Sequence, residues 1–68
     1  MVNTELLEDR IRLSGKKKTY LAQQIGLTLA GFRNCCVNKS EFKVSQVKIL
    51  CHELGVNSAD MMKIFFAN

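Results

Sequence analysis

Three glycines divide the chain into segments whose apolar residues recur at the spacing of an α-helix. Gly15, Gly26 and Gly55 each directly follow such a segment, and a glycine at that position commonly ends a helix by adopting a positive φ. Proline is absent, and the β-branched residues do not alternate with polar ones as they do in half-buried strands. The sequence therefore predicts an all-α protein.

Five helices are predicted from the apolar spacing and from the polar residues that precede each segment. They span residues 4–14, 18–25, 29–36, 46–54 and 59–66. The expected N-caps are Asn3 or Thr4 for the first helix, Thr28 for the third, Ser45 for the fourth and Ser58 for the fifth. Because 68 residues supply one small core, we predict a single domain over residues 1–68, a compact five-helix bundle.

The predicted core follows one face of each helix. Its members are Leu7, Ile11, Leu21, Ala22, Ile25, Phe32, Cys35, Val47, Leu50, Cys51 and Leu54. Two aromatic residues end the fifth helix, and only one of Phe65 and Phe66 is expected to point inward. The other either lines a homodimer contact or belongs to an ordinary exposed end.

Positive charge is concentrated in the middle of the chain. The formal net charge is +4, and residues 10–48 hold nine basic residues against one acidic residue, Glu41. Residues 1–9 are acidic, with no base among them. Such a basic centre suits a polyanion or the acidic face of a protein, although a merely solvated surface is the simpler alternative.

The stretch LAQQIGLTLAGFRNCCVNK at residues 21–39 predicts two short helices that meet at a tight turn. This layout indicates a helix-turn-helix at about residues 18–36. The chain resembles the phage Cro and lambda-repressor type of helix-turn-helix family, and in particular the small Cro-like regulators of temperate phages from Gram-positive bacteria. The residues that carry the resemblance are Leu21-Ala22, Gly26, Thr28, Phe32, Asn38-Lys39, the string KSEFKVSQ at 39–46 and Leu54-Gly55-Val56.

The resemblance implies a transcriptional regulator, such as a Cro-like repressor, that binds double-stranded operator DNA. It places phosphate contacts at Lys17, Lys18, Thr28, Lys39 and Lys43. It places Leu29, Ala30, Arg33 and Asn34 at the positions that face the major groove. In that setting Arg33 reads a guanine edge, Asn34 reads an adenine edge, and Leu29 and Ala30 meet thymine methyl groups.

A second hypothesis uses the same fold for a different partner. Leu29, Ala30 and Val37 are apolar positions on an otherwise polar helix face. Such a patch suits binding to another regulator protein, for example a phage repressor, so that the chain acts as an anti-repressor or modulator.

Other classes of function are not expected from this sequence. One histidine and no Ser-His-Asp set argue against an enzyme, and we predict no cofactor. Cys35-Cys36 and Cys51-His52 are two adjacent pairs, and neighbours on a helix diverge by about 100°, so at most one member of each pair faces a shared ion and no metal site is predicted. No segment reaches the roughly 20 apolar residues of a membrane span. With three cysteines and no secretory signal, we expect a protein of the bacterial host cytoplasm.

Overall fold

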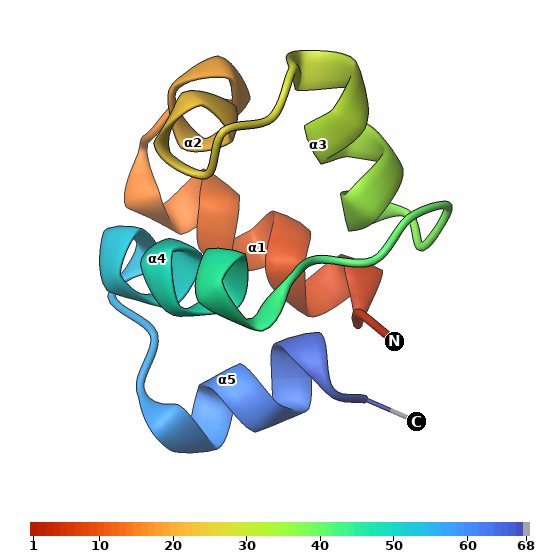
Figure 1. Cartoon of the computed structure of the whole chain (residues 1–68). Coiled ribbons are helices and arrows are strands. Elements are labelled where there is room, and N and C mark those ends of the chain that lie inside the picture. Colours follow the sequence, from red (N-terminus) through yellow and green to blue (C-terminus); the bar gives the residue numbers. More distant parts are fainter. Residues whose placement is uncertain (68) are drawn as a thin grey trace.

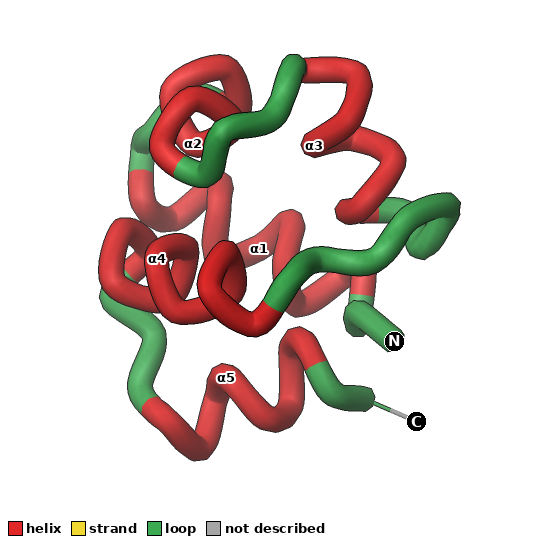
Figure 2. The backbone as a smooth tube through the Cα atoms, viewed as in Figure 1, coloured by secondary structure: helices red, strands yellow, loops and turns green. Residues whose placement is uncertain are grey.

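The structure, a computed structural model, describes residues 1–67, and every regular element within them is an α-helix. In chain order the helices are α1 (Thr4–Ser14), α2 (Lys18–Gln24), α3 (Leu29–Cys36), α4 (Val44–Leu54) and α5 (Ser58–Phe65). Short loops join them, as Figure 2 shows. The chain is an all-α five-helix bundle with a Cα radius of gyration of 10.5 Å, as predicted.

The helices lie in three tiers. In Figure 1, α2 and α3 occupy one end of the molecule, α5 occupies the opposite end, and α1 and α4 lie between them. Helix α2 contacts both α3 and α4, while α5 contacts α1 and α4. Helix α3 is therefore at the end of the molecule opposite α5 (Figure 1), and three of its residues, Ala30, Arg33 and Asn34, are exposed.

Helix ends agree with the prediction to within two residues. Gly15, Gly26 and Gly55 adopt φ values of 69°, 73° and 67° at the ends of α1, α2 and α4, as their positions in the sequence predict. Asn3 caps α1, since its Oδ1 accepts the Leu6 N–H at 3.2 Å. Helices α2 and α5 each end one residue earlier than predicted.

Two predicted N-caps are wrong. Helix α4 begins at Val44 rather than residue 46, and its N-cap is Lys43, whose N–H donates to the Gln46 Oε1 at 2.8 Å. That hydrogen bond draws Ser45 into the first turn. Helix α5 is capped by Asn57, whose Oδ1 accepts the Asp60 N–H at 2.8 Å. In both cases the polar residue that caps the helix lies earlier in the chain than the serine.

The predicted core residues named above are all buried. Leu6, which the sequence places beside Leu7 and Ile11, is instead 39% exposed. The structure adds Val2, Cys36, Ile64 and Phe65 to this core. As expected, only one of the two terminal aromatics points inward, since Phe65 is buried and Phe66 is exposed. Full burial of a large apolar side chain stabilises a fold by about 1.5–3 kcal/mol, so these contacts hold the five short helices together. Within the described residues, no helix has the length and apolarity needed to cross a membrane.

Candidate functional site

A tight turn, residues 25–28, joins α2 to α3. Gly26 takes the left-handed conformation there, and the Leu27 N–H donates to the Ala22 carbonyl at 2.9 Å. Ala22 is 1% exposed, so this hydrogen bond is anchored on a buried part of α2. The start of α3 is therefore held in a defined position relative to α2.

Thr28 caps α3, as predicted. Its Oγ1 accepts the Gly31 N–H at 3.0 Å. A Cβ atom on Gly31 would lie 3.2 Å from Thr28 Oγ1, which is closer than ordinary van der Waals contact, so the glycine leaves room for the cap. Glycine costs a helix about 1 kcal/mol relative to alanine, and the cap offsets a comparable amount.

Helix α3 has one buried and one open face. Phe32, Cys35 and Cys36 are at most 4% exposed and turn toward the bundle. The predicted groove-facing residues lie on the other side, where Ala30, Arg33 and Asn34 are exposed and Leu29 is half-buried. Val37, which follows the helix, is 52% exposed. The structure thus brings the predicted base-reading residues together on one helix surface.

Four ion pairs divide the basic residues into those that have a carboxylate partner and those that do not. The pairs are Arg10–Asp60 at 2.6 Å, Arg12–Asp9 at 3.1 Å, Lys16–Glu53 at 2.9 Å and Lys18–Glu8 at 2.7 Å. All but Arg12–Asp9 tie together segments far apart in the chain. Arg10 and Lys18 thus join different helices, and Lys16 joins the loop before α2 to α4. Arg12 pairs within α1, and a carboxylate offsets the charge of each of the four cations.

The remaining cations have no ion pair within residues 1–67. They are Lys17, Arg33, Lys39, Lys43, Lys48 and Lys63. Of these, only Lys63 lies on α5; the others belong to the start of α2, to α3, to the loop after it and to α4. Residues 10–40 contain no Asp or Glu. Four of these six cations lie between residues 17 and 43, the part of the chain that includes α3, and Glu41 is the one acidic residue in that part.

Lys16, Tyr20 and Glu53 form a cluster that the sequence did not predict. The Lys16 Nζ donates to the Glu53 backbone carbonyl at 2.7 Å and to its Oε1 at 2.9 Å, and the Tyr20 hydroxyl donates to the same Oε1 at 3.0 Å. Hydrogen bonds from Lys16 and Tyr20 lower the pKa of Glu53, and the bond to Glu53 raises the pKa of Tyr20. The cluster fastens the start of α2 to the end of α4.

The loop after α3, residues 37–43, is closed by backbone hydrogen bonds to the helix. The Lys39 N–H donates to the Asn34 carbonyl at 2.9 Å, and the Asn38 N–H donates to the Cys35 carbonyl at 3.3 Å. Asn38 has a φ of 66° and is the sole residue other than glycine with a positive φ among those described. This pattern is a Schellman motif, with Asn38 in the position that glycine usually takes. Lys39 is thereby tied to the end of α3.

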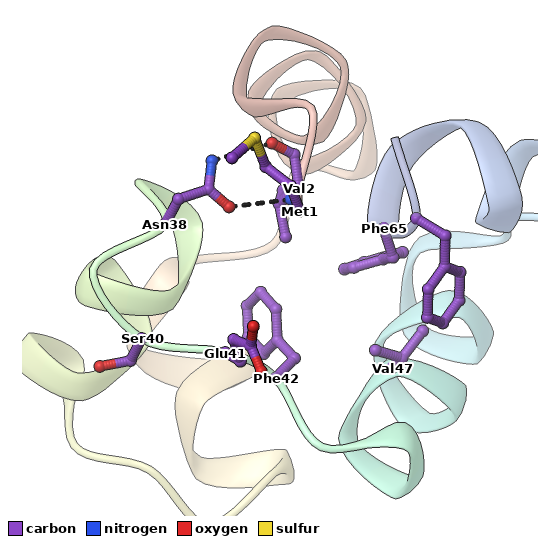
Figure 3. A pocket seen from close by; sticks show the side chains of 9 residues that line it. Met1, Val2, Asn38, Ser40, Glu41, Phe42, Val47 and Phe65 are labelled. Atoms are coloured by element: carbon purple, nitrogen blue, oxygen red, sulfur yellow. Dashed lines mark hydrogen bonds between the residues drawn. The ribbon is translucent and has the colours of Figure 1, made fainter. Parts of the chain in front are cut away.

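The Asn38 side chain holds a segment from the other end of the sequence. Its Oδ1 accepts the Val2 N–H at 2.8 Å, and its Nδ2 donates to the Val2 carbonyl at 3.0 Å (Figure 3). The tolerance of asparagine for the left-handed conformation, just after a predicted helix, is the signal that points to this residue. Nothing in the sequence identifies Val2 as its partner.

The three cysteines are buried thiols. Cys35, Cys36 and Cys51 are free and at most 7% exposed, which confirms that Cys35 and Cys51 act as small core residues. Burial raises the pKa of all three, that of Cys36 to about 12. Within the described residues, no three side chains of the metal-binding types gather at one point.

Comparison with protein families, curated proteins and solved structures finds no match to this chain.

Proposed function

We propose that this protein binds double-stranded DNA through the open face of α3 and regulates transcription, as a helix-turn-helix protein of the Cro kind does. The observation that carries the proposal is the distribution of unpaired charge. Four cations without an ion pair lie in the part of the chain from residue 17 to residue 43, which includes α3: Lys17, Arg33, Lys39 and Lys43. Because α2, α3 and the turn between them contain no acidic residue, they suit the phosphate backbone of DNA.

Affinity would come from phosphate contacts on either side of α3. Lys17 precedes α2 and Lys39 follows α3, and both are exposed. Lys18 would contribute less than Lys17, because the Glu8 carboxylate 2.7 Å from its Nζ offsets its charge. The Thr28 hydroxyl accepts the Gly31 N–H, which leaves its own proton free to donate to a phosphate oxygen. Lys43 extends this set along the loop.

Sequence preference would come from four residues on α3. Arg33 and Asn34 are exposed and carry the side chains that pair bidentately with guanine and adenine edges. Ala30 and the half-buried Leu29 present methyl groups, which suit contact with the thymine methyl. We therefore expect a preference of moderate strength at a few base pairs.

The salt dependence of binding tests the phosphate contacts. A short duplex of random sequence is titrated with the protein at several salt concentrations. Replacing Lys17 and Lys39 together by alanine should flatten the slope of log K against log salt by about two units, since each phosphate contact contributes about 0.9. Lys63→Ala on α5 is the matched control, because Lys63 is also exposed and unpaired. An equal effect of both changes, or a slope near zero for the wild type, would contradict the proposal.

A second candidate function is binding to another regulator protein, such as a phage repressor, through α3. Leu29 and Ala30 are apolar residues at the start of α3, and Val37, which follows its end, is 52% exposed, so apolar side chains lie at both ends of the helix that carries Arg33. Leu29→Gln separates the two candidates. It leaves a side chain that can bond a base, so DNA binding should survive. In a protein contact it buries an unpaired amide, which costs about 1–3 kcal/mol and weakens the complex about tenfold.

The two measurements for Leu29→Gln are DNA binding and capture of a purified phage repressor from the same genome. The melting temperature serves as a control, because Leu29 is half-buried. If the wild type does not bind DNA but captures the repressor, and the variant loses capture, the second candidate replaces the first.

A further inference from the structure

We propose that Asn38 is a positioning residue for DNA binding, which sets the basic loop after α3 by holding the backbone of Val2. This inference rests on the proposed function, because it assigns a role in the same site. Asn38 itself need not touch DNA. Its contribution is to fix the place of Lys39, the next residue in the chain.

The two hydrogen bonds of Asn38 fix both the position and the orientation of its side chain. One side-chain atom accepts from the Val2 N–H and the other donates to the Val2 carbonyl, at 2.8 and 3.0 Å. Two bonds to one residue prevent the amide from rotating. The loop after α3 is therefore attached to the segment before α1, 36 residues away in the sequence.

Val2, the partner of Asn38, is itself held firmly in the fold. Its side chain is 8% exposed and belongs to the hydrophobic core. The next residue, Asn3, donates its N–H to the Ile64 carbonyl at 2.6 Å and also caps α1. A loop attached to Val2 is thereby positioned against both α1 and α5.

Packing alone does not hold this part of the loop, since residues 37–41 are all exposed. A cavity of about 190 Å³ lies beside it, with Val2 and Asn38 on one side and Phe42 and Phe65 on another (Figure 3). The loop rests on the core again at Phe42, whose ring contacts that of Phe65 edge-to-face at 5.7 Å between centroids. Between these two supports lie residues 39–41. The hydrogen bonds of Asn38 therefore take the place of apolar contacts at the end of the loop that carries Lys39.

The backbone conformation of Asn38 also shapes the loop. Asn38 has a φ of 66°, and this conformation allows the Lys39 and Ser40 N–H groups to reach the Asn34 carbonyl, at 2.9 and 3.3 Å. Glycine adopts the same φ without strain. Asn38→Gly therefore removes the two side-chain hydrogen bonds while it preserves the turn, which makes it the informative substitution.

The test compares Asn38→Gly with Asn57→Ala in binding to a short DNA duplex of random sequence, well below both melting temperatures. Asn57→Ala is the matched control, because it removes an amide that caps α5 and so lowers stability away from α3. We expect Asn38→Gly to bind about fivefold more weakly, with a salt slope lower by about one unit, as for the loss of one phosphate contact. We expect Asn57→Ala to bind like the wild type.

A double-mutant cycle with Lys39→Ala distinguishes positioning from a general loss of stability. If Asn38 acts by placing Lys39, then Asn38→Gly should weaken binding little further once Lys39 is alanine. Wild-type affinity in Asn38→Gly, or losses that multiply fully in the double variant, would overturn the inference and leave DNA binding by α3 intact. Failure of the wild type to bind any duplex would overturn the proposed function, and this inference with it.

Discussion

Helices α3 and α5 have the same length and the same kind of N-terminus, and they differ in how they use charge. Each has eight residues. Thr28 caps α3 and Asn57 caps α5, each by accepting a backbone N–H three residues later. Each helix buries one face, with Phe32 at the centre of one and Ile64 in the other. Packing and capping alone do not distinguish a helix that binds a partner from one that only completes the core.

Charge does distinguish them. The acidic residue of α5, Asp60, accepts a hydrogen bond from Arg10 of α1 at 2.6 Å, so its charge is used within the fold. The single charged residue of α3 is Arg33, which is exposed and forms no ion pair within residues 1–67. Helix α5 also has an exposed cation without an ion pair, Lys63, so an unpaired cation alone does not locate the candidate site. Helix α3 differs from α5 because neither it, nor α2, nor the turn between them contains an acidic residue, and this difference in local charge marks the candidate site.

The largest expected effect on stability concerns the buried face, which α3 and α5 both have. Phe32→Ala should lower the free energy of unfolding by about 3–5 kcal/mol, as removal of a fully buried aromatic ring generally does. Phe32 is 0% exposed, and its ring meets that of Phe42 at 6.0 Å between centroids. Urea denaturation measures the loss. A loss below about 1 kcal/mol would show that α3 packs far less tightly than its burial indicates.

The next largest effect should distinguish the proposed role of α3 from that of α5. Arg33→Ala should reduce discrimination at one base pair by about 1–3 kcal/mol while non-specific binding persists. Lys63→Ala removes the exposed cation of α5 and should change neither quantity. Selection from a random duplex library, repeated with each variant, measures the preference. If Arg33→Ala weakens binding to all sequences equally, Arg33 contacts a phosphate rather than a base.

Removing the caps should affect stability equally and DNA binding unequally. Thr28→Ala and Asn57→Ala each delete a hydrogen bond to a backbone N–H, and each should cost about 1 kcal/mol of stability. Only Thr28→Ala should also weaken DNA binding, because its hydroxyl is a proposed phosphate donor. Thermal melts and duplex titrations of both variants make the comparison. Equal affinities would remove Thr28 from the proposed interface.

The smallest effect concerns the Glu53 carboxylate, which accepts hydrogen bonds from Lys16 and Tyr20 within the fold. Its pKa is lowered, by the hydrogen bond from Lys16 and then by that from Tyr20. It therefore contributes stability that is fully present above its ordinary pKa of 4.5 and is lost as the pH falls through the lower folded value. Glu53→Gln should melt below the wild type at pH 7, and the difference should shrink in acid. Glu41→Gln, in the loop, is the control. A difference that does not change with pH would contradict this assignment.

The sequence predicts the helices well because local rules determine where they begin and end. Gly15, Gly26 and Gly55 follow apolar segments with helical spacing, and all three have a positive φ. The N-cap of α4 is less predictable. Lys43 occupies this position, and the hydrogen bond there runs from the Lys43 N–H to the side chain of Gln46, so the identity of residue 43 itself gives no signal. The cap of α5 was misassigned because Asn57 and Ser58 are adjacent and both are good caps.

The site is less predictable, because its electrostatics depend on contacts between distant residues. Lys17 and Lys18 are neighbours in the sequence, yet only Lys18 meets Glu8 of α1. Lys17 precedes α2 with an extended backbone, whereas Lys18 is the first residue of the helix, so the two side chains reach different surroundings. The attachment of Asn38 to Val2 joins residues 36 positions apart. No periodicity or motif encodes either contact.

The burial of the three cysteines gives the chain a built-in reporter of unfolding. Alkylating reagents attack the thiolate, and burial both excludes the reagent and raises the pKa of Cys36 to about 12. A short pulse of reagent therefore leaves folded molecules unmodified and adds up to three adducts to unfolded ones. Intact mass then counts the two populations directly, without an added dye, at any temperature or urea concentration.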